Sequence, residues 1–149
     1  MNNDIDKPFM ADASKEAKLA FSEREVPVGA VIVIDNKIVA RGRNSRVKDN
    51  LVTSHAEINA ITSLEKELNQ RILDNATIYV TLEPCPMCSY AILESHIKRL
   101  VYGAPDPKRG AISTLDIFNK SLGQKIEVCG NIEKEECESL LKEFFKELR

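Results

Sequence analysis

The stretch TIYVTLEPCPMC, residues 77–88, decides the fold class of this chain. Its first half, from Thr77 to Leu82, predicts a β-strand. Cys85 then lies where a helix N-cap is expected, and Pro86 takes the first helical position, where its missing N–H costs nothing. The stretch therefore predicts a strand that leads directly into a helix, which runs to about Ser95, with two cysteines at the junction.

Upstream of this stretch the sequence predicts a β-hairpin. The segment from Val28 to Ile34 is almost wholly apolar and β-branched, as in a strand that is buried on both faces. Asp35-Asn36 favours a turn, after which the segment from Lys37 to Gly42 can return antiparallel to the first strand.

The remaining predicted elements are helices and strands in alternation. They comprise a helix from Pro8 to Arg24, a helix from Ser54 to about Leu68, a strand from Arg99 to Gly103, a short helical stretch near Leu115, a strand from Lys125 to Cys129, and a final helix whose apolar stripe runs from Cys137 to Leu148. Strand–helix–strand order implies parallel pairing with helices on both faces of the sheet. The sequence therefore predicts an α/β fold.

Length and composition are those of one globular domain, residues 1–149. Hydrophobic residues make up 43% and charged residues 30%, and no apolar run approaches the roughly 20 residues of a membrane helix. The N-terminal sequence MNNDIDKPFMAD is polar and unlike a secretory signal, so we expect a soluble, cytoplasmic protein with no membrane partner. The formal net charge of -2 argues against broad, non-specific nucleic-acid binding.

Two short segments, His55-Ala56-Glu57 and Cys85-Pro86-Met87-Cys88, carry candidate metal ligands. Cys88 follows Cys85 by about one helical turn, so the two sulfurs can converge on one ion. His55 begins an earlier helix and supplies a third ligand, and this set of donors suits zinc. Three protein ligands leave a fourth position for water, whose pKa zinc lowers to about 7. Glu57 can reach the same cavity and transfer protons there.

Each of these residues also has a purely structural interpretation. Ser54 and Glu57 match a capping box, in which Glu57 would only stabilise a helix N-terminus. A structural zinc site would instead need a fourth ligand, for which the chain offers Cys129, Cys137 and His96. The order HxE followed by PCxxC favours a zinc deaminase, because this pattern is the signature of that class.

Longer segments around these motifs resemble the cytidine-deaminase superfamily and, within it, the bacterial tRNA-specific adenosine deaminases of the TadA type. The residues that carry the resemblance are REVPVGAV (24–31), Asn44, HAE (55–57), YVTLEPCPMC (79–88), YGA (102–104), Asp106, Lys108, Gly110 and Phe144-Phe145. The resemblance covers nearly the whole chain. It implies a three-layer α/β/α, cytidine-deaminase-like fold, in which a five-stranded mixed sheet with an N-terminal antiparallel hairpin has helices on both faces.

The resemblance also implies hydrolytic deamination of adenosine to inosine at the wobble position of a tRNA anticodon. It implies one Zn2+ per subunit, a homodimer, and an anticodon stem-loop as the partner. His55, Cys85 and Cys88 match the zinc ligands of the family, and Glu57 matches its proton shuttle. The positions that match its substrate-binding residues are Asn44, Val28, Ala56, Leu82 and Asp106. The candidate RNA backbone contacts are Arg43, Arg46, Lys108 and Arg109.

Two further interpretations remain open at the level of sequence. A deaminase of a free nucleobase or nucleoside, such as guanine or cytosine, would use the same zinc set, although VPVGA (26–30) and LEPC (82–85) fit that class less well. A non-catalytic zinc-binding module would be expected to lack the shuttle carboxylate, whereas Glu57 is present. Phe144 and Phe145 could stack on bases, but their helical spacing predicts core packing.

Overall fold

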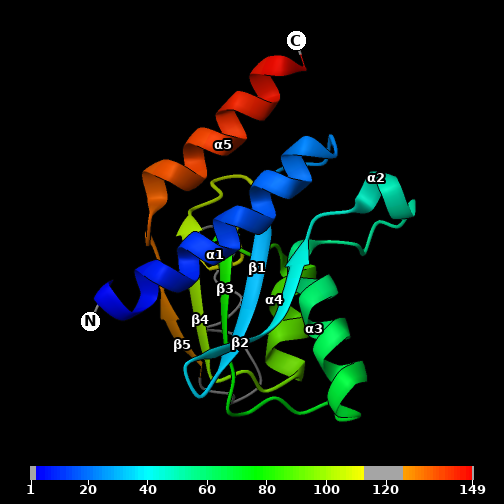
Figure 1. The fold of residues 1–149 in the computed structure, drawn as a ribbon, viewed down its shortest axis with the longest axis vertical. Coiled ribbons are helices and arrows are strands. Elements are labelled where there is room, and N and C mark those ends of the chain that lie inside the picture. Colours follow the sequence, from blue (N-terminus) through cyan, green and yellow to red (C-terminus); the bar gives the residue numbers. More distant parts are fainter. Residues whose placement is uncertain (1–2, 113–125, 149) are drawn as a thin grey trace.

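The protein forms one mixed β-sheet between two layers of helices, as a computed structural model shows for residues 3–112 and 126–148 (Figure 1). In the spatial order of the sheet, the strands are β2 (Lys37–Arg43), β1 (Gly29–Ile34), β3 (Thr77–Leu82), β4 (Arg99–Ala104) and β5 (Glu127–Cys129). The helices are α1 (Asn3–Ser22), α2 (Arg46–Asp49), α3 (Ala56–Leu68), α4 (Pro86–Glu94) and α5 (Lys134–Glu147). Within the described ranges, no helix is long and apolar enough to cross a membrane.

The predicted N-terminal hairpin is confirmed. β1 and β2 pair antiparallel, and the turn residues Asp35 and Asn36 both have positive φ, at 52° and 61°. Positive φ at both central residues is typical of a type I′ turn, and Asp and Asn tolerate this conformation well. β1 is also antiparallel to β3, whereas β3, β4 and β5 run parallel to one another. The sheet is therefore mixed, as predicted.

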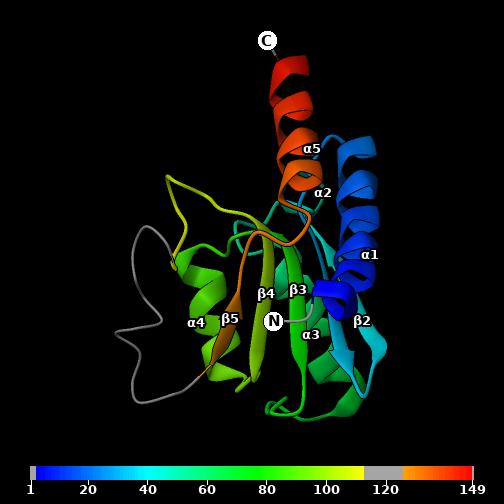
Figure 2. The same ribbon diagram turned by 90° about the vertical axis from the view of Figure 1, so that its left-hand side faces the viewer.

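Helices cover both faces of the sheet, which confirms the predicted three-layer α/β/α architecture. α1 and α5 lie on one face, and α3 and α4 lie on the other (Figures 1 and 2). Each face of the sheet has its own hydrophobic core, and successive side chains of β1 point alternately into the two cores. Ile32 packs in one core with Leu64 of α3, and Val31 packs in the other with Met10 of α1. All four side chains are fully or almost fully buried, so the strand is buried on both faces as its sequence predicts.

Helix α3 lies close against β2 because Gly42 has no side chain. A Cβ at this position would lie 2.3 Å from the carbonyl oxygen of Ala56 and 2.6 Å from the amide nitrogen of Ala60, both in the backbone of α3. Backbone atoms cannot swing aside as the end of a flexible side chain can, so a larger residue would displace the helix. The close approach thereby fixes the first turn of α3, which carries Glu57, relative to the sheet.

Helix α1 begins at Asn3, five residues before the predicted start at Pro8. A buried ion pair accounts for the difference. The guanidinium of Arg99 donates to both carboxylate oxygens of Asp6 at 2.7 Å, and the Tyr79 hydroxyl donates to Asp6 Oδ1 at 2.8 Å. Asp6 is only 2% exposed. This contact holds the first turn of the helix. Pro8 has no N–H to donate, but near the start of the helix this removes only one backbone hydrogen bond.

A second difference lies between β2 and α3, where the sequence predicts a polar loop and the structure contains the short helix α2. The buried carboxylate of Glu25 explains this helix, because it accepts the N–H groups of Val47 at 3.1 Å and Lys48 at 2.8 Å. The helical stretch predicted near Leu115 lies outside the described residues, as does Lys125 at the start of the last predicted strand.

We expect Asp6→Asn to lower the free energy of unfolding by about 3 kcal/mol, because Arg99 would lose a buried partner. Urea denaturation at neutral pH measures this loss. Glu127→Gln is the matched control, since it removes a contact of the same guanidinium, at 3.5 Å, with a carboxylate that is 66% exposed. That exposed pair contributes at most about 1 kcal/mol. Equal losses of unfolding free energy in the two variants would contradict the conclusion that Asp6 makes the stabilising contact with Arg99.

The same ion pair gives the fold a defined response to acid. Hydrogen bonding from Arg99 lowers the pKa of Asp6 below its ordinary value near 3.8, even though burial acts in the opposite direction. The stabilisation is fully present above the unfolded-state pKa and is lost as the pH falls through the lower folded-state pKa. Unfolding measured across acid pH should therefore depend less steeply on pH in Asp6→Asn than in the wild-type protein.

Candidate active site

The ends of four strands meet at one edge of the sheet and bring the candidate residues together. Asn44 follows β2, Cys85 follows β3 and Asp106 follows β4. Because β1 runs antiparallel to β2 and β3, Val28 at its start lies at the same edge. Helices α3 and α4 also begin there. Ligand sites of α/β proteins commonly lie at the carboxyl ends of strands, and this edge has that character.

His55, Cys85 and Cys88 form a cluster whose spacing fits a tetrahedral metal site. Nδ1 of His55 lies 3.6 Å from Sγ of Cys85 and 3.4 Å from Sγ of Cys88. Zinc bound at about 2.05 Å from nitrogen and about 2.3 Å from sulfur, with tetrahedral angles, requires an N···S separation of about 3.5 Å. Within the described ranges, no fourth His, Cys, Asp or Glu joins this group. The donor set therefore fits zinc and leaves a coordination position open.

Helix starts position the donors of this cluster. His55 is the N-cap of α3 and Cys85 is the N-cap of α4, and neither side chain hydrogen-bonds to its own helix as a cap. Pro86 takes the first helical position, as predicted, and Cys88 lies one turn further on and is fully buried. The positive ends of both helix dipoles therefore face the cluster, where they favour thiolate ligands.

The two thiols of the cluster differ in acidity. A hydrogen bond from the Cys88 thiol holds the pKa of Cys85 well below its usual range, and hydrogen bonding with His55 acts in the same direction. The same bond to Cys85, together with burial, raises the pKa of Cys88. Metal binding displaces thiol protons, so an ion held by this cluster would bring both sulfurs to the thiolate form.

Glu57 lies next to the cluster and is 4% exposed. It does not form the alternative capping box with Ser54, because the N-cap of α3 is His55 and Glu57 is therefore the second residue of the helix instead of the third. Burial raises the pKa of Glu57 to about 7. A carboxyl group with this pKa can both accept and donate a proton near neutral pH.

A cavity of about 490 Å³ opens beside the cluster, within the usual range for small-ligand sites. His55, Cys85 and Glu57 all line it. The residues that the resemblance assigns to substrate binding also all line it, namely Val28, Asn44, Ala56, Leu82 and Asp106. Among the candidate RNA contacts, the structure brings to the cavity Arg46, Lys108 and Arg109.

Asn44 is held firmly in the cavity wall and leaves one buried polar atom without a partner. Its backbone N–H donates to the carbonyl of Val28 at 3.1 Å, and its Nδ2 donates to the carbonyl of Val26 at 3.3 Å. Within the described part of the chain, Asn44 Oδ1 is the one buried side-chain oxygen or nitrogen that lacks a hydrogen-bond partner. An unmade buried hydrogen bond is costly, so this acceptor indicates a place for a donor on a bound ligand.

Comparison with known proteins identifies the family. Residues 3–149 match the family model of the MafB19-like deaminases. The chain is also 42% identical to the tRNA-specific adenosine deaminase of Bacillus subtilis (strain 168), over 97% of this chain and 91% of that protein. This chain belongs to the tRNA-specific adenosine deaminase family.

Solved structures agree with this assignment. One of them comes from a study of A-to-I editing by tRNA:A34 deaminases at the wobble position of transfer RNA. It matches with a TM-score of 0.85 and 41% identity, over 89% of this chain and 98% of that chain. A guanine deaminase from Bacillus subtilis matches with a TM-score of 0.64 and 36% identity, over 70% of this chain and 66% of that chain. A guanine deaminase from Nitrosomonas europaea shares the fold over 93% of this chain and 83% of that chain with a TM-score of 0.82 but only 18% identity, so sequence identity and not the fold separates the tRNA deaminase match from it.

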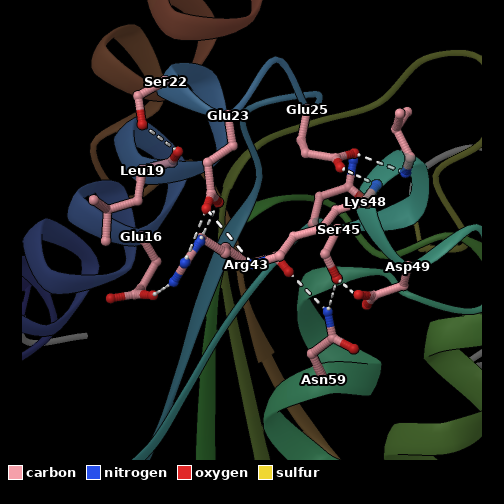
Figure 3. A network of polar contacts seen from close by, with 12 residues as sticks. Glu16, Leu19, Ser22, Glu23, Glu25, Arg43, Ser45, Lys48, Asp49 and Asn59 are labelled. Carbon is pink, nitrogen blue, oxygen red and sulfur yellow. Dashed lines mark hydrogen bonds and ion pairs between the residues drawn. The ribbon is translucent and has the colours of Figure 1, made fainter.

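In this member of the tRNA-specific adenosine deaminase family, Arg43 is directed toward α1 and the segment that follows it. Its guanidinium donates to Glu23 at 2.7 and 3.3 Å and lies 3.5 Å from Glu16 (Figure 3). Its carbonyl accepts a hydrogen bond from Asn59 of α3, which also donates to Ser45 (Figure 3). These contacts fix both neighbours of Asn44, and a contact of Arg43 with RNA stays a prediction.

The other basic candidates are more available to a ligand. Arg46, Lys108 and Arg109 are exposed, and no salt bridge within residues 3–112 and 126–148 involves them. Arg41, by contrast, is paired with Asp12 at 3.3 Å. Of the two predicted RNA contacts in this part of the chain, Arg43 and Arg46, only Arg46 lines the cavity in the described structure.

Helix α5 contributes to the cavity, which the sequence does not predict. Phe144 is buried and packs edge-on against Phe21 of α1, so its predicted core position is confirmed. The same prediction for Phe145 is wrong, because this side chain is 49% exposed and lines the cavity. Adjacent residues on a helix point about 100° apart. The C-terminal end of α5 also extends beyond the sheet (Figure 2).

We expect Cys88→Ser to reduce the bound zinc from one ion per chain to nearly none, because a serine hydroxyl is a poor zinc ligand. Atomic emission on protein dialysed against a weak chelator measures the metal content. Cys129→Ser is the matched control, since Cys129 is also a buried cysteine but does not belong to the cluster. Zinc retained by Cys88→Ser, or lost equally from both variants, would contradict the site.

Proposed function

We propose that this chain is a zinc-dependent hydrolase that converts adenosine to inosine at the wobble position of a tRNA anticodon. The observation that carries the proposal is a cluster of three zinc-type donors, two of which, His55 and Cys85, line one cavity together with the buried Glu57. Relatives named for this activity match nearly the whole chain at 41% and 42% identity. The proposed enzyme is a single domain over residues 1–149, acts in the cytoplasm, and takes an anticodon stem-loop as its substrate.

The reaction replaces the C6 amino group of adenine with oxygen and releases ammonia. One zinc ion per subunit, held by His55, Cys85 and Cys88, would supply a water made acidic enough to attack near neutral pH. Glu57 is placed to accept a proton from the attacking water and to return it to the ring and the departing amine. The pKa of about 7 caused by burial suits this exchange in both directions.

The cavity accounts for how one base could be held. C6 is inaccessible within a base stack, so the target nucleotide must turn out of the RNA and enter the cavity. Apolar contacts to its ring would come from Val28, Ala56 and Leu82. The unpaired Asn44 Oδ1 would accept a hydrogen bond from a donor of the nucleoside.

The mouth of the cavity suits RNA on either side of that nucleotide. Asp106 is half-buried and lies at the start of a segment that presents two exposed cations, Lys108 and Arg109. Arg46 lines the cavity from α2. Cations at two places around the opening can neutralise phosphates that flank the inserted base.

We also propose that the enzyme is a homodimer that covers the apolar surface next to the zinc ligands. Two groups of exposed apolar side chains lie close to the zinc ligands in the sequence. One group precedes His55 and consists of Val47, Leu51 and Val52, and the other lies next to the cysteines on α4 and consists of Met87 and Tyr90. Exposed apolar groups of this kind mark protein–protein contacts.

Light scattering should give the mass of two chains for the wild-type protein, and Val52→Asp should shift the measured mass toward that of one chain. A monomeric wild-type protein at micromolar concentration would contradict the dimer.

We expect the zinc-loaded protein to form inosine in an anticodon stem-loop that carries adenosine at the wobble position. Free guanine, cytosine, cytidine and adenosine, assayed in parallel for ammonia release, should remain unchanged. Ammonia from a free base, with the RNA unmodified, would retain the zinc chemistry and overturn the proposed substrate.

Glu57→Gln tests the proposed proton shuttle in the same assay. We expect turnover to fall by about 10²- to 10⁴-fold while the zinc content stays at one ion per chain, because the amide cannot exchange the proton. Glu67 lies on the exposed side of the same helix, so Glu67→Gln serves as the control and should retain wild-type turnover. Normal activity in Glu57→Gln would remove this carboxylate from the mechanism.

A further inference from the structure

The segment that follows β4 is tied to the residues that immediately precede the zinc ligand Cys85. We call residues 105–112 the cavity loop. At one end of this loop the N–H of Glu83 donates to the carbonyl of Ala104 at 2.8 Å. At the other end the N–H of Ala111 donates to the carbonyl of Pro84 at 3.0 Å. The loop therefore lies along the backbone of residues 83–84.

The side chain of Glu83 joins the two ends of the cavity loop. Its Oε1 accepts the N–H of Asp106 at 2.9 Å, and its Oε2 accepts the N–H of Ile112 at 2.9 Å. Glu83 is only 2% exposed. Hydrogen bonds from N–H groups to a carboxylate are stronger than those between neutral groups. One buried carboxylate thus holds both ends of the loop.

Gly110 shows how closely the cavity loop encloses this carboxylate. A Cβ on Gly110 would lie 2.3 to 2.4 Å from the carboxyl carbon and both carboxylate oxygens of Glu83. Within the loop, Oδ1 of Asp106 accepts the N–H groups of Lys108 at 3.0 Å and Arg109 at 3.1 Å. The turn that presents the two basic side chains is therefore built on Asp106, which Glu83 holds in place.

We propose that Glu83 is a positioning residue that sets the place of the cavity loop at the mouth of the active site. Both of its oxygens accept loop N–H groups, so Glu83 acts on the substrate through Asp106, Lys108 and Arg109. Its fixed geometry would determine how well the enzyme binds the nucleotides next to the target adenosine. This consequence for the substrate rests on the function proposed above, whereas the attachment of the loop does not.

The opposite wall of the cavity offers a matched control. Glu25 is also 2% exposed, and its carboxylate also accepts two backbone N–H groups. Those groups belong to Val47 and Lys48 of α2 rather than to the cavity loop. Glu25→Gln and Glu83→Gln therefore make the same chemical change in the same kind of environment, on two different segments.

Hydrogen–deuterium exchange on the full-length, zinc-loaded protein tests the attachment directly. In Glu83→Gln the side-chain amide keeps one acceptor, but its NH₂ group faces an N–H donor. We expect amides of the cavity loop to exchange at least about tenfold faster than in the wild type, with residues 46–49 unchanged. Glu25→Gln should give the reverse pattern.

Gly110→Ala provides a second perturbation that keeps the carboxylate. Its methyl group must displace the carboxyl end of the Glu83 side chain and meets no backbone atom among its three nearest neighbours. We expect the same loop-limited increase in exchange, so the test remains decisive if Glu83→Gln does not fold. Unchanged exchange in the loop, or a uniform increase throughout the chain, would overturn the proposal.

Steady-state kinetics on the anticodon stem-loop test the consequence for the substrate. We expect KM to rise by about tenfold in Glu83→Gln while kcat changes less and zinc content is retained, because the loop binds flanking nucleotides and not the reacting atoms. A loosened loop with unchanged KM would overturn the link to substrate binding. A wild-type protein inactive on this RNA would refute the proposed function, and the exchange data would still decide the attachment.

Discussion

Two helices, α3 and α4, begin at the same edge of the sheet, and the site depends on how their N-termini meet there. Each places its N-cap residue, His55 or Cys85, at the meeting point. The antiparallel placement of β1 between β2 and β3 makes this possible, because it brings the end of β2 and the start of β1 to the edge where β3 ends. The helix dipoles then favour the anionic sulfurs that a metal ion requires.

Among the buried glutamates of the described residues, the three that are at most 4% exposed lie around this edge, and their contacts separate their roles. Glu25 and Glu83 each accept two N–H groups from a segment that lines the cavity, which makes them part of its walls. For Glu57, burial is the dominant influence, and it brings the pKa to about 7. Burial alone therefore does not identify a proton-transfer group. What distinguishes Glu57 is its place beside the metal cluster, where His55, Cys85 and Cys88 all act on its carboxyl group.

Local signals were enough to predict most of the fold. The strand–turn–helix around Cys85 follows from Pro86, and the hairpin follows from Asp35-Asn36, because each depends on residues adjacent in sequence. The early start of α1 could not be predicted, since it depends on a contact between Asp6 and the distant Arg99. The short helix α2 depends in the same way on Glu25.

The candidate site, like the fold, could be predicted from the sequence only in part. The HxE and PCxxC motifs indicate its metal ligands, and the family resemblance indicates the residues that line the cavity. Neither shows that Arg43 is hydrogen-bonded to Glu23, or that Phe145 faces the cavity, because both depend on how α1 and α5 pack.

The ion pair near the start of α1 and the ion pair just after its end differ in exposure to solvent. The Asp6–Arg99 pair is buried, whereas the side chains of Glu23 and Arg43 are about one-third exposed. Dissolved ions screen exposed charges far more than buried ones. Rising ionic strength should therefore weaken the Glu23–Arg43 contact, next to Asn44 in the sequence, well before it weakens the Asp6–Arg99 contact that holds the start of α1.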